Sequence, residues 1–211
     1  MREHGAYFLK TGEVFELPEQ TFIDVVVPVT KEYERFSISK IVTVCSIQIV
    51  GNTTLTERLY SRMLCGHYNK HKIEAVRDIL ESTSDRVIIF YNFDGELDAL
   101  KQLLNNLDRP VSEVNGHVKD LTAHYEHNNA VTLVQYQAGA MGLNLQLANK
   151  IIYFTPTEKC ELWQQSIKRI HRIGQQWPCF YYKIVCKNSV EEKIYTALAR
   201  GVDFTDYLFL H

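Results

Sequence analysis

The hydrophobic residues of this chain are grouped in short continuous runs, separated by longer segments in which they recur at helical spacing. The continuous runs predict strands at residues 86–90, 130–134, 151–154 and 180–185, with a weaker candidate at 110–114. The intervening segments predict helices at residues 70–80, 96–107, 118–127, 158–173 and 190–199. Strands that are apolar on both faces and alternate with helices are typical of a mainly parallel sheet covered on both sides. We therefore expect a three-layer α/β/α domain.

The N-terminal part of the chain does not follow this alternation. Residues 21–29 form a β-branched run that predicts a strand, and Thr30 is suited to cap a short helix after it. An apolar stretch without a clear period follows, and it ends at a Gly-Asn break. We therefore predict a strand and helical leader segment over residues 1–52 and a main domain over residues 53–211.

Composition narrows the class of protein but does not point to a ligand. The chain has 211 residues, of which 45% are hydrophobic, which suits one globular domain with an appendage. It has no apolar run near the roughly 20 residues that a membrane span needs, and we expect no signal peptide. The five cysteines are scattered without a C-x-x-C pair, so we expect neither a zinc site nor disulfides. These features predict a cytoplasmic protein, with a nuclear location left open, and a net charge of −2 does not suggest nucleic-acid binding.

The most informative stretch is QSIKRIHRIGQ, residues 165–175. Arg169 and Arg172 are three residues apart on a predicted helix, so we expect them to point the same way. Two guanidinium groups side by side form a planar, multidentate grip for phosphate. An isolated pair of this kind is more often a solvated basic face, but the neighbouring His171, Gly174 and Gln175 make the string more specific.

A second stretch, QAGAMGLNL at residues 137–145, directly follows a predicted strand. Its glycines at positions 139 and 142 permit close approach of the backbone to a ligand, although a tight turn that binds nothing explains them equally well. Ligands of parallel α/β sheets bind beyond the carboxyl ends of the strands. We therefore expect this turn and the two arginines to face a cleft at that edge.

Taken together, the two stretches resemble motifs V and VI of the Swi/Snf family of superfamily 2 helicase-like ATPases. Residues 86–93 resemble motif IV, Val114-Asn115-Gly116 stands where the family has its next turn, and residues 190–194 resemble its closing helix. The resemblance covers most of the chain from about residue 70 onward. The order and spacing of these motifs support the match at motif VI.

The sequence departs from the family pattern at three places. Phe154-Thr155-Pro156-Thr157 replaces an acidic residue and a Trp-Asn-Pro, Ser166 and Lys168 replace small residues, and Gly139-Ala140 stands where paired glycines are common. Both arginines of motif VI are kept. The resemblance therefore extends to the arginines, while the contacts at these three places stay open.

The resemblance implies a second, C-terminal RecA-like lobe of an ATP-dependent motor that translocates on double-stranded DNA. In that role Arg169 and Arg172 would be the catalytic arginine fingers. The residues that would approach the nucleotide are Gln165, Gly142, Asn144 and Gln175. The residues that would face DNA are Tyr91, Asn92, Asn115, Gly116, Gln137, Ala138 and Gly139.

Two motifs of a complete ATPase are missing from this sequence. It contains no G-x-x-x-x-G-K-[ST] phosphate loop and no Asp-Glu pair of a DEAH-like magnesium site. We therefore expect ATP and Mg²⁺ to be held mainly by an N-terminal RecA-like lobe, in the same full-length chain or a separate one. The present chain alone is predicted to be inactive as an ATP hydrolase.

Other interpretations of the sequence remain. The chain is alternatively a non-catalytic DNA- or protein-binding module derived from such a lobe, because the missing phosphate loop fits that equally well. An unrelated α/β enzyme with a phosphorylated ligand at the 139–142 turn leaves the spacing to the two arginines unexplained. His67 and His71 are four residues apart, as metal ligands on a helix can be, but no third ligand is evident and we expect no metal site.

Overall fold

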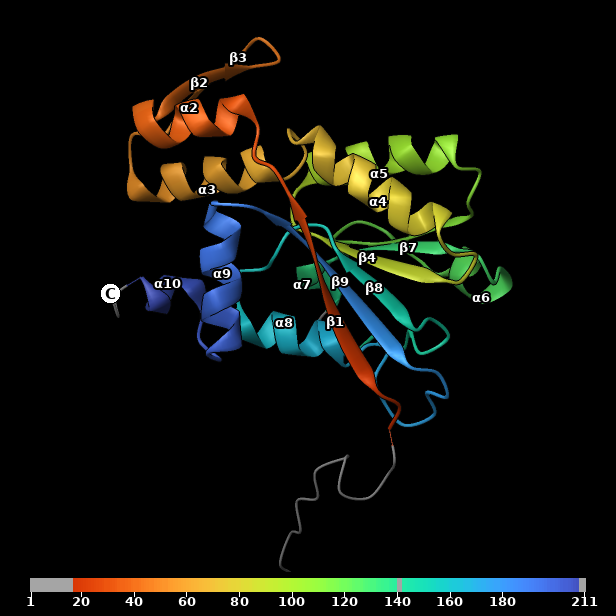
Figure 1. Ribbon diagram of the computed structural model, residues 1–211. Helices are drawn as coiled ribbons and strands as arrows, with labels where there is room; N and C mark the ends of the chain where they lie inside the picture. The colour runs from red at the N-terminus through yellow and green to blue at the C-terminus, as the bar shows by residue number, and fades with distance from the viewer. Residues whose placement is uncertain (1–16, 140–141, 209–211) are drawn as a thin grey trace, which may run out of the picture.

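A seven-stranded sheet forms the centre of the computed structural model, which describes residues 17–139 and 142–208 (Figure 1). The strand order is β1-β9-β8-β4-β7-β5-β6, and every neighbouring pair is parallel except β5 and β6. The strands are β1 (Gln20–Val27), β4 (Val87–Tyr91), β5 (Val111–Val114), β6 (Lys119–Asp120), β7 (Val131–Gln135), β8 (Lys150–Tyr153) and β9 (Cys179–Cys186). Helices lie on both sides of the sheet, which confirms the predicted α/β fold.

The two helical layers account for the continuous apolar strands. α3 (Thr54–Cys65), α4 (Lys70–Glu81) and α5 (Asp94–Asn106) lie on one side of the sheet, and α8 (Cys160–Ile167) lies on the other (Figure 1). All five residues of the central strand β4 are buried. Val87, Ile89 and Tyr91 belong to the core on the α4 side, whereas Ile88 and Phe90 belong to the core on the other side. A strand covered on both faces needs apolar side chains at every position, because neither face meets water.

One predicted helix is shorter in the structure than in the sequence pattern. The helix expected over residues 118–127 begins only at Thr122, as α6 (Thr122–Glu126), because β6 takes the preceding residues into the sheet beside β5. The Asn115 N–H donates to the carbonyl of Val118, and the Asp120 carboxylate accepts from the Thr122 N–H. These bonds close a hairpin turn where the sequence pattern suggested the first helical turn.

The leader segment contributes directly to the main sheet. Its strand β1 pairs with β9 in parallel along all eight residues and forms one edge of the sheet. After it, α2 (Lys31–Ser39) packs on α3, and β2 (Ile41–Val44) and β3 (Ile47–Val50) form a separate hairpin (Figure 1). The predicted division at residue 52 stays a prediction, but the first strand of the leader is hydrogen-bonded to the domain that follows it.

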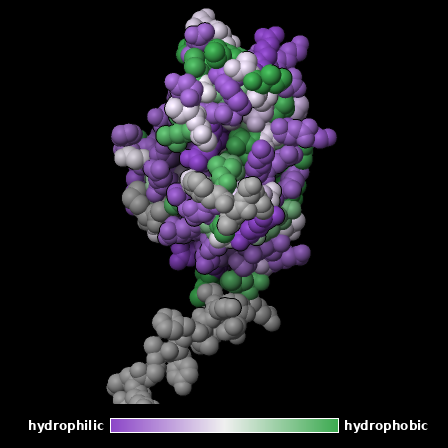
Figure 2. All heavy atoms as spheres, turned by 90° about the vertical axis from the view of Figure 1, so that its left-hand side faces the viewer, coloured by the Kyte–Doolittle hydropathy of each residue, from purple (hydrophilic) through white to green (hydrophobic). Residues whose placement is uncertain are grey.

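The surface formed by the leader and the C-terminal helices is mostly polar. Figure 2 shows this face, which carries α2, α3, α9 (Val190–Ala199) and α10 (Phe204–Tyr207), with hydrophobic side chains near the top where α2 and the hairpin lie. The exposed apolar residues there are Ile38, Ile41, Ile47 and Val50. Within residues 17–139 and 142–208, no helix has both the length and the apolar character needed to cross a membrane.

A buried ion pair joins the α4 side of the sheet to the C-terminal part of the chain. The Lys72 ammonium on α4 is fully buried and lies 2.6 Å from a carboxylate oxygen of Glu191 on α9. It also donates to the carbonyls of Phe154 and Ile184, at the ends of β8 and β9. Burial is the largest single effect on the pKa of Lys72 and lowers it. The charge and hydrogen bond of Glu191, together with the nearby Cys186 and Cys65, outweigh burial and raise the pKa, so the ammonium remains charged.

His124, on α6, makes stability depend on pH. Its ring is buried, with Nδ1 2.9 Å from Thr132 Oγ1, and burial together with the charge of Arg86 lowers its pKa to about 4. The unfolded chain takes up this proton near pH 6.5, so the free energy of unfolding falls as the pH drops from 6.5 toward 4. We expect His124 to account for a loss of roughly 3 kcal/mol over that range.

Urea unfolding at several pH values, compared with the variant His124→Asn, measures this contribution. The asparagine keeps an amide nitrogen near Thr132 but does not titrate, so the variant should lose less stability on acidification. The same pH dependence in both proteins would show that His124 is protonated equally in the folded and unfolded states.

Candidate functional site

The two arginines of the QSIKRIHRIGQ stretch lie in a loop rather than on a helix. α8 ends at Ile167, so the helix expected over residues 158–173 is wrong in its second half. The reason lies in the backbone hydrogen bonds after Ile167. The Arg169 carbonyl, which a longer helix would give to residue 173, accepts instead from the Leu145 N–H at 3.3 Å. Arg169 is therefore positioned by contact with the segment that precedes β8, and Arg172 follows it in the same loop.

This loop lies at the amino edge of the sheet, opposite the edge that the sequence suggested. α8 begins beyond the carboxyl end of β8 and runs back along the sheet, as a crossover between parallel strands requires (Figure 1). The chain after it therefore emerges at the edge where β8 and β9 begin. His171 Nε2 lies 2.9 Å from the carbonyl oxygen of Pro18, just before β1, which confirms this placement. The expectation that the arginines face the carboxyl edge is thus corrected.

The glycine turn that follows β7 leads to the same place. The Arg169 guanidinium donates from Nη1 to the Leu143 carbonyl at 3.3 Å, so this arginine contacts the segment around Gly142 and Asn144. Gly142 has a φ of +70°, and no atom of the described residues, apart from its chain neighbours, lies within 4 Å of the position that a Cβ would occupy. Asn144 is exposed. The structure therefore brings together the two stretches on which the nucleotide prediction depends.

The electrostatics of this loop favour an anion. Arg169 is partly buried and Arg172 is exposed, and neither takes part in any ion pair among the described residues. Burial lowers the pKa of Arg169, and the nearby positive charge of Arg172 lowers it further. Arg169 Nε is also buried without a hydrogen-bond partner. Two adjacent guanidinium groups without a carboxylate suit a multidentate phosphate or other anion.

Gln165 and Gln175, both predicted to approach the nucleotide, differ in how much of each amide is free. Gln165, on α8, donates to Glu161 at 2.8 Å, and its Oε1 is buried without a partner. Gln175 is buried, and its amide is used within the protein. Its Nε2 lies within hydrogen-bond distance of the carbonyls of Gln146, Ala148 and Ile170, and its Oε1 accepts from the N–H groups of Gln176 and Trp177. Its role in nucleotide binding stays a prediction, while its contacts hold two loops together.

Replacement of Gln175 by alanine is expected to lower the free energy of unfolding by roughly 2–4 kcal/mol, because buried carbonyl groups lose their donor. Urea unfolding followed by tryptophan fluorescence and circular dichroism measures the change. Gln176→Ala is the matched control, since Gln176 is exposed and should change stability by less than about 0.5 kcal/mol. Equal stabilities of the two variants would mean that the hydrogen bonds of the Gln175 amide contribute nothing to the free energy of unfolding.

The residues predicted to face DNA gather at the opposite, carboxyl edge of the sheet. They lie at or just after the ends of β4, β7 and β5, which are neighbours in the sheet, so the three turns lie side by side. The turn after β5 is fixed by Asn115 Oδ1, which accepts from the N–H groups of His117 and Val118, and Gly116 is exposed at its tip. Gln137, in α7 (Tyr136–Gly139), is exposed as well.

Other members of this predicted DNA face have little or no free surface. Tyr91 is fully buried and Ala138 is 5% exposed, so neither can touch DNA in this conformation. Asn92 donates from Nδ2 to the hydroxyl of Thr155 and to the carbonyl of Pro156. Gly139 ends α7. Among the members of this predicted DNA face whose exposure is described, Gly116 and Gln137 are exposed and Asn115 is half-buried.

A buried carboxyl group that sequence reasoning missed organises this edge. Glu96, on α5, accepts from the Asn92 N–H at 2.8 Å and from the Thr155 hydroxyl at 3.0 Å. Burial raises its pKa, although the bonds from the backbone of Asn92 and Phe93 act in the opposite direction. The available signal was the glutamate in the first turn of the predicted helix, which is where a capping glutamate stands. Thr155 is one of the residues at which the sequence departs from the Swi/Snf pattern. Its hydrogen bond to Glu96 gives that departure a structural role.

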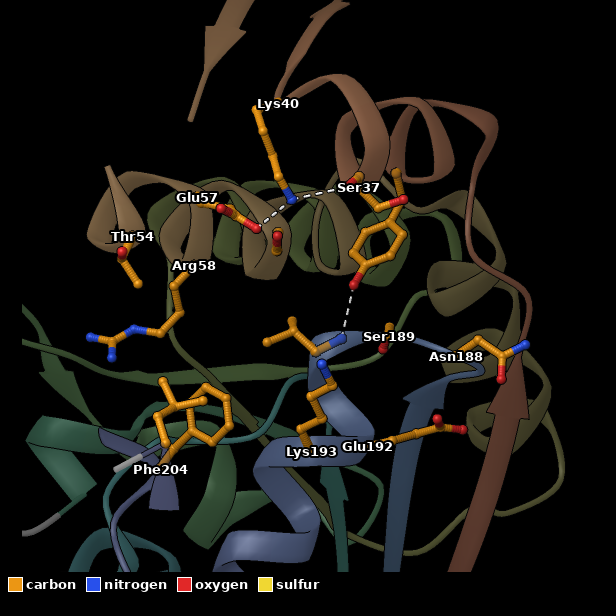
Figure 3. Close-up of a pocket in the computed structure, with 14 residues that line it drawn as sticks. Ser37, Lys40, Thr54, Glu57, Arg58, Asn188, Ser189, Glu192, Lys193 and Phe204 are labelled. Atoms are coloured by element: carbon orange, nitrogen blue, oxygen red, sulfur yellow. Dashed lines mark hydrogen bonds and ion pairs between the residues drawn. The ribbon is translucent and has the colours of Figure 1, made fainter. Parts of the chain in front are cut away.

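Two further features were candidates for ligand sites. A hollow of about 520 Å³ lies between α2, α3, α9 and α10, and Lys40, Arg58 and Lys193 are the cations that line it (Figure 3). Two of them are already paired, Lys40 with Glu57 and Arg58 with Glu158. Among the described residues, one group could offer three metal ligands, namely Cys65, Cys186 and Glu191. The Lys72 ammonium already occupies the Glu191 carboxylate, which argues against a metal ion at that position.

Comparison with known proteins gives the family. Residues 71–174 match the family described as Helicase conserved C-terminal domain. The chain is 28% identical over 152 residues to the DNA repair and recombination protein RDH54 of Saccharomyces cerevisiae, an alignment that covers 67% of this chain and 16% of RDH54. The chain belongs to the C-terminal lobes of Swi/Snf-type helicase-like ATPases. The chain spans less than a fifth of the length of RDH54.

Further relatives of the helicase lobe carry related names. It is 30% identical over 132 residues to the ATP-dependent helicase fft1 of Schizosaccharomyces pombe, covering 58% of this chain and 14% of fft1. It is 28% identical over 122 residues to the human chromatin-remodeling ATPase INO80, covering 54% of this chain and 8% of INO80. The solved C-terminal part of the Fun30 ATPase domain has the same fold, with a TM-score of 0.69 at 16% identity over 86% of this chain and 89% of that chain.

Proposed function

We propose that this helicase lobe is the second half of an ATP-driven motor that moves along double-stranded DNA, and that Arg169 and Arg172 act as its arginine fingers. The observation that carries the proposal is geometric: Arg169 is bonded to the Leu143 carbonyl beside Gly142, and neither Arg169 nor Arg172 is in an ion pair within the described part of the chain. The names of the relatives, which include DNA repair proteins and a chromatin-remodeling ATPase, support a DNA substrate. A cytoplasmic or nuclear location is part of the same proposal.

The proposed role of the arginines follows from their charge. ATP and Mg²⁺ would be held by an N-terminal lobe, because this chain lacks a phosphate loop. Hydrolysis spreads negative charge over the oxygens of the transferred phosphoryl group. Arg172, which is exposed, would reach those oxygens when the lobes close, and Arg169 would support it from its bond to Leu143. Cations already fixed in position stabilise that charge without further reorganisation.

The proposed DNA face is the carboxyl edge of the sheet. Gly116 and Gln137 are exposed there and Asn115 is half-buried. These residues would contact the phosphate backbone, and such contacts do not depend on the base sequence. The two proposed faces lie at opposite edges of one sheet, so a change at the nucleotide would reach DNA through a movement of the whole lobe.

The deciding experiment measures ATP hydrolysis by a protein that contains both lobes, with and without duplex DNA, before and after Arg169 and Arg172 are replaced. Stimulation by DNA that disappears in both arginine variants supports the proposal. Hydrolysis that does not respond to the substitutions would remove the finger assignment.

The second candidate function is a non-catalytic module that binds DNA or a protein. The absence of a phosphate loop and of an Asp-Glu pair from this chain favours it as much as it favours a divided motor. The coding sequence upstream of Met1 separates the two, since a phosphate loop there would complete the ATPase. A third candidate, an unrelated phosphate-binding α/β enzyme, is inconsistent with the family match.

A further inference from the structure

Three large apolar side chains are exposed beside the arginines. Leu147, Ile173 and Trp177 are 51%, 53% and 66% exposed. They belong to two loops that Gln175 ties together through its bonds to the carbonyls of Gln146 and Ala148. We call these three side chains the loop patch. Exposed apolar groups that cluster near a functional site mark a surface that contacts another molecule.

The backbone under Trp177 is held firmly, although its side chain is free. The Trp177 N–H donates to Gln175 Oε1 at 3.1 Å, and its carbonyl accepts from the Cys179 thiol at 3.7 Å. The carbonyl of the next residue, Pro178, accepts from Asn149 at 3.0 Å. A large aromatic side chain on a fixed backbone loses little conformational entropy when a partner covers it. Tryptophan in this setting is a frequent centre of binding energy at protein interfaces.

The polypeptide that leads into β1 passes along the same edge. The Pro18 carbonyl oxygen lies 2.9 Å from His171 Nε2, and the Glu19 carbonyl accepts from the Cys179 N–H at 2.8 Å. A domain attached upstream would therefore be tethered next to the loop patch. Such a tether gives two surfaces an effective concentration in the millimolar range, so a small apolar contact is enough to join them.

We infer that the loop patch is the docking point for the N-terminal ATPase lobe of the same polypeptide, which would present a shallow apolar pocket to Trp177. This inference rests on the proposed function, and adds to it the side chains that hold the closed state. Ile173 is next to Arg172 in the chain, so docking of the patch would carry the arginine toward a phosphate held by the other lobe. Trp177 is thus a positioning residue, distinct from the two catalytic arginines.

The test compares Trp177→Ala with Leu55→Ala in a protein that contains both lobes. Leu55 is 65% exposed on α3, on the other side of the sheet, and serves as the matched control. Each protein is assayed for DNA-stimulated ATP hydrolysis and for the distance between the lobes, by energy transfer between one dye on each lobe. With ATP and duplex DNA, we expect Trp177→Ala to lower kcat at least tenfold and to reduce the closed population. The KM for ATP should change less than twofold, and Leu55→Ala should change neither property.

The possible outcomes separate this inference from the proposed function. Normal kcat and closure in Trp177→Ala, with hydrolysis still lost in Arg172→Ala, would overturn the docking role and leave the proposed function intact. A raised KM for ATP with normal closure would mean that Trp177 touches the nucleotide, which also overturns it. Partial recovery in Trp177→Phe, with thermal unfolding unchanged in all variants, would support an apolar contact over a structural role.

Discussion

Replacement of Arg172 by alanine, in a protein that contains both lobes, should lower DNA-stimulated ATP hydrolysis by about 10³-fold or more. Its guanidinium is exposed and takes part in no ion pair among the described residues, so its loss removes positive charge from the surface of the loop without disturbing the core. Arg169→Ala should give a similar loss of kcat. It should also cost some stability, because Arg169 is partly buried and bonded to Leu143. The measurement is the steady-state rate at saturating ATP and DNA.

Two controls test whether this result depends on the guanidinium group of Arg172. Arg172→Lys keeps the charge but not the planar set of donors, so we expect it to recover only part of the lost rate. Arg77→Ala removes an exposed arginine from α4, on the other side of the sheet, and should leave the rate unchanged. If Arg77→Ala and Arg172→Ala reduced hydrolysis equally, general electrostatics rather than a finger would explain the effect.

Replacement of Lys72 by methionine is expected to destabilise the fold by about 3–5 kcal/mol, because Glu191 would then be a buried carboxylate without its cation. The carbonyls of Phe154 and Ile184 would lose a donor as well. Urea unfolding gives the change in free energy. If the variant is too unstable to purify, Lys72→Arg, which keeps the charge in a larger side chain, provides a milder version of the same comparison.

A double-mutant cycle isolates the ion pair from the packing around it. Glu191→Gln alone should also destabilise, and the double variant with Lys72→Met should lose less than the sum of the two single changes. The matched surface pair is Lys159 with Asp203, in which the lysine side chain is 58% exposed. Breaking that pair should change stability far less, because exposed ion pairs are screened by solvent. Strictly additive effects of the Lys72 and Glu191 substitutions would mean that the two charges do not support one another.

The sequence predicted the central layers well because their pattern depends on burial alone. β4, β7, β8 and β9 were recognised from continuous apolar runs, and α5 from its leucine stripe. The second half of the helix predicted over residues 158–173 does not form, and its local sequence pattern gives no sign of this. Its carbonyl at Arg169 bonds to Leu145, a residue from another loop. Competition of this kind depends on tertiary contacts that neighbouring residues do not encode.

The candidate site was predicted in its residues but not in its geometry. The motif strings identified Arg169, Arg172, Gly142 and Asn144 as one group, and the structure brings these segments into contact. The arginines were predicted at the wrong edge of the sheet, because that edge depends on the direction of α8, which the motif does not specify. Tyr91 was assigned to the DNA face although it is fully buried, since a strand-end residue has the same sequence context whichever way it points.

The buried Lys72–Glu191 pair could not have been foreseen from the sequence. Its two residues lie 119 positions apart, and each is polar in a helix where a polar residue ordinarily faces solvent. Only the fold places α4 and α9 so that the ammonium can close over the ends of β8 and β9. The role of Gln175 could not be foreseen either, because its amide bonds to carbonyls of a loop nearly thirty residues earlier in the chain.

The position of β1 at the sheet edge has a mechanical consequence. The strand runs parallel to β9 along its whole length, and the polypeptide before Gln20 leaves from its amino end. A pull on that polypeptide, directed along the strand, loads the hydrogen bonds between β1 and β9 together in shear. Peeling would break them one after another at much lower force. A strand attached in this way would resist traction along the polypeptide before Gln20 without unravelling there.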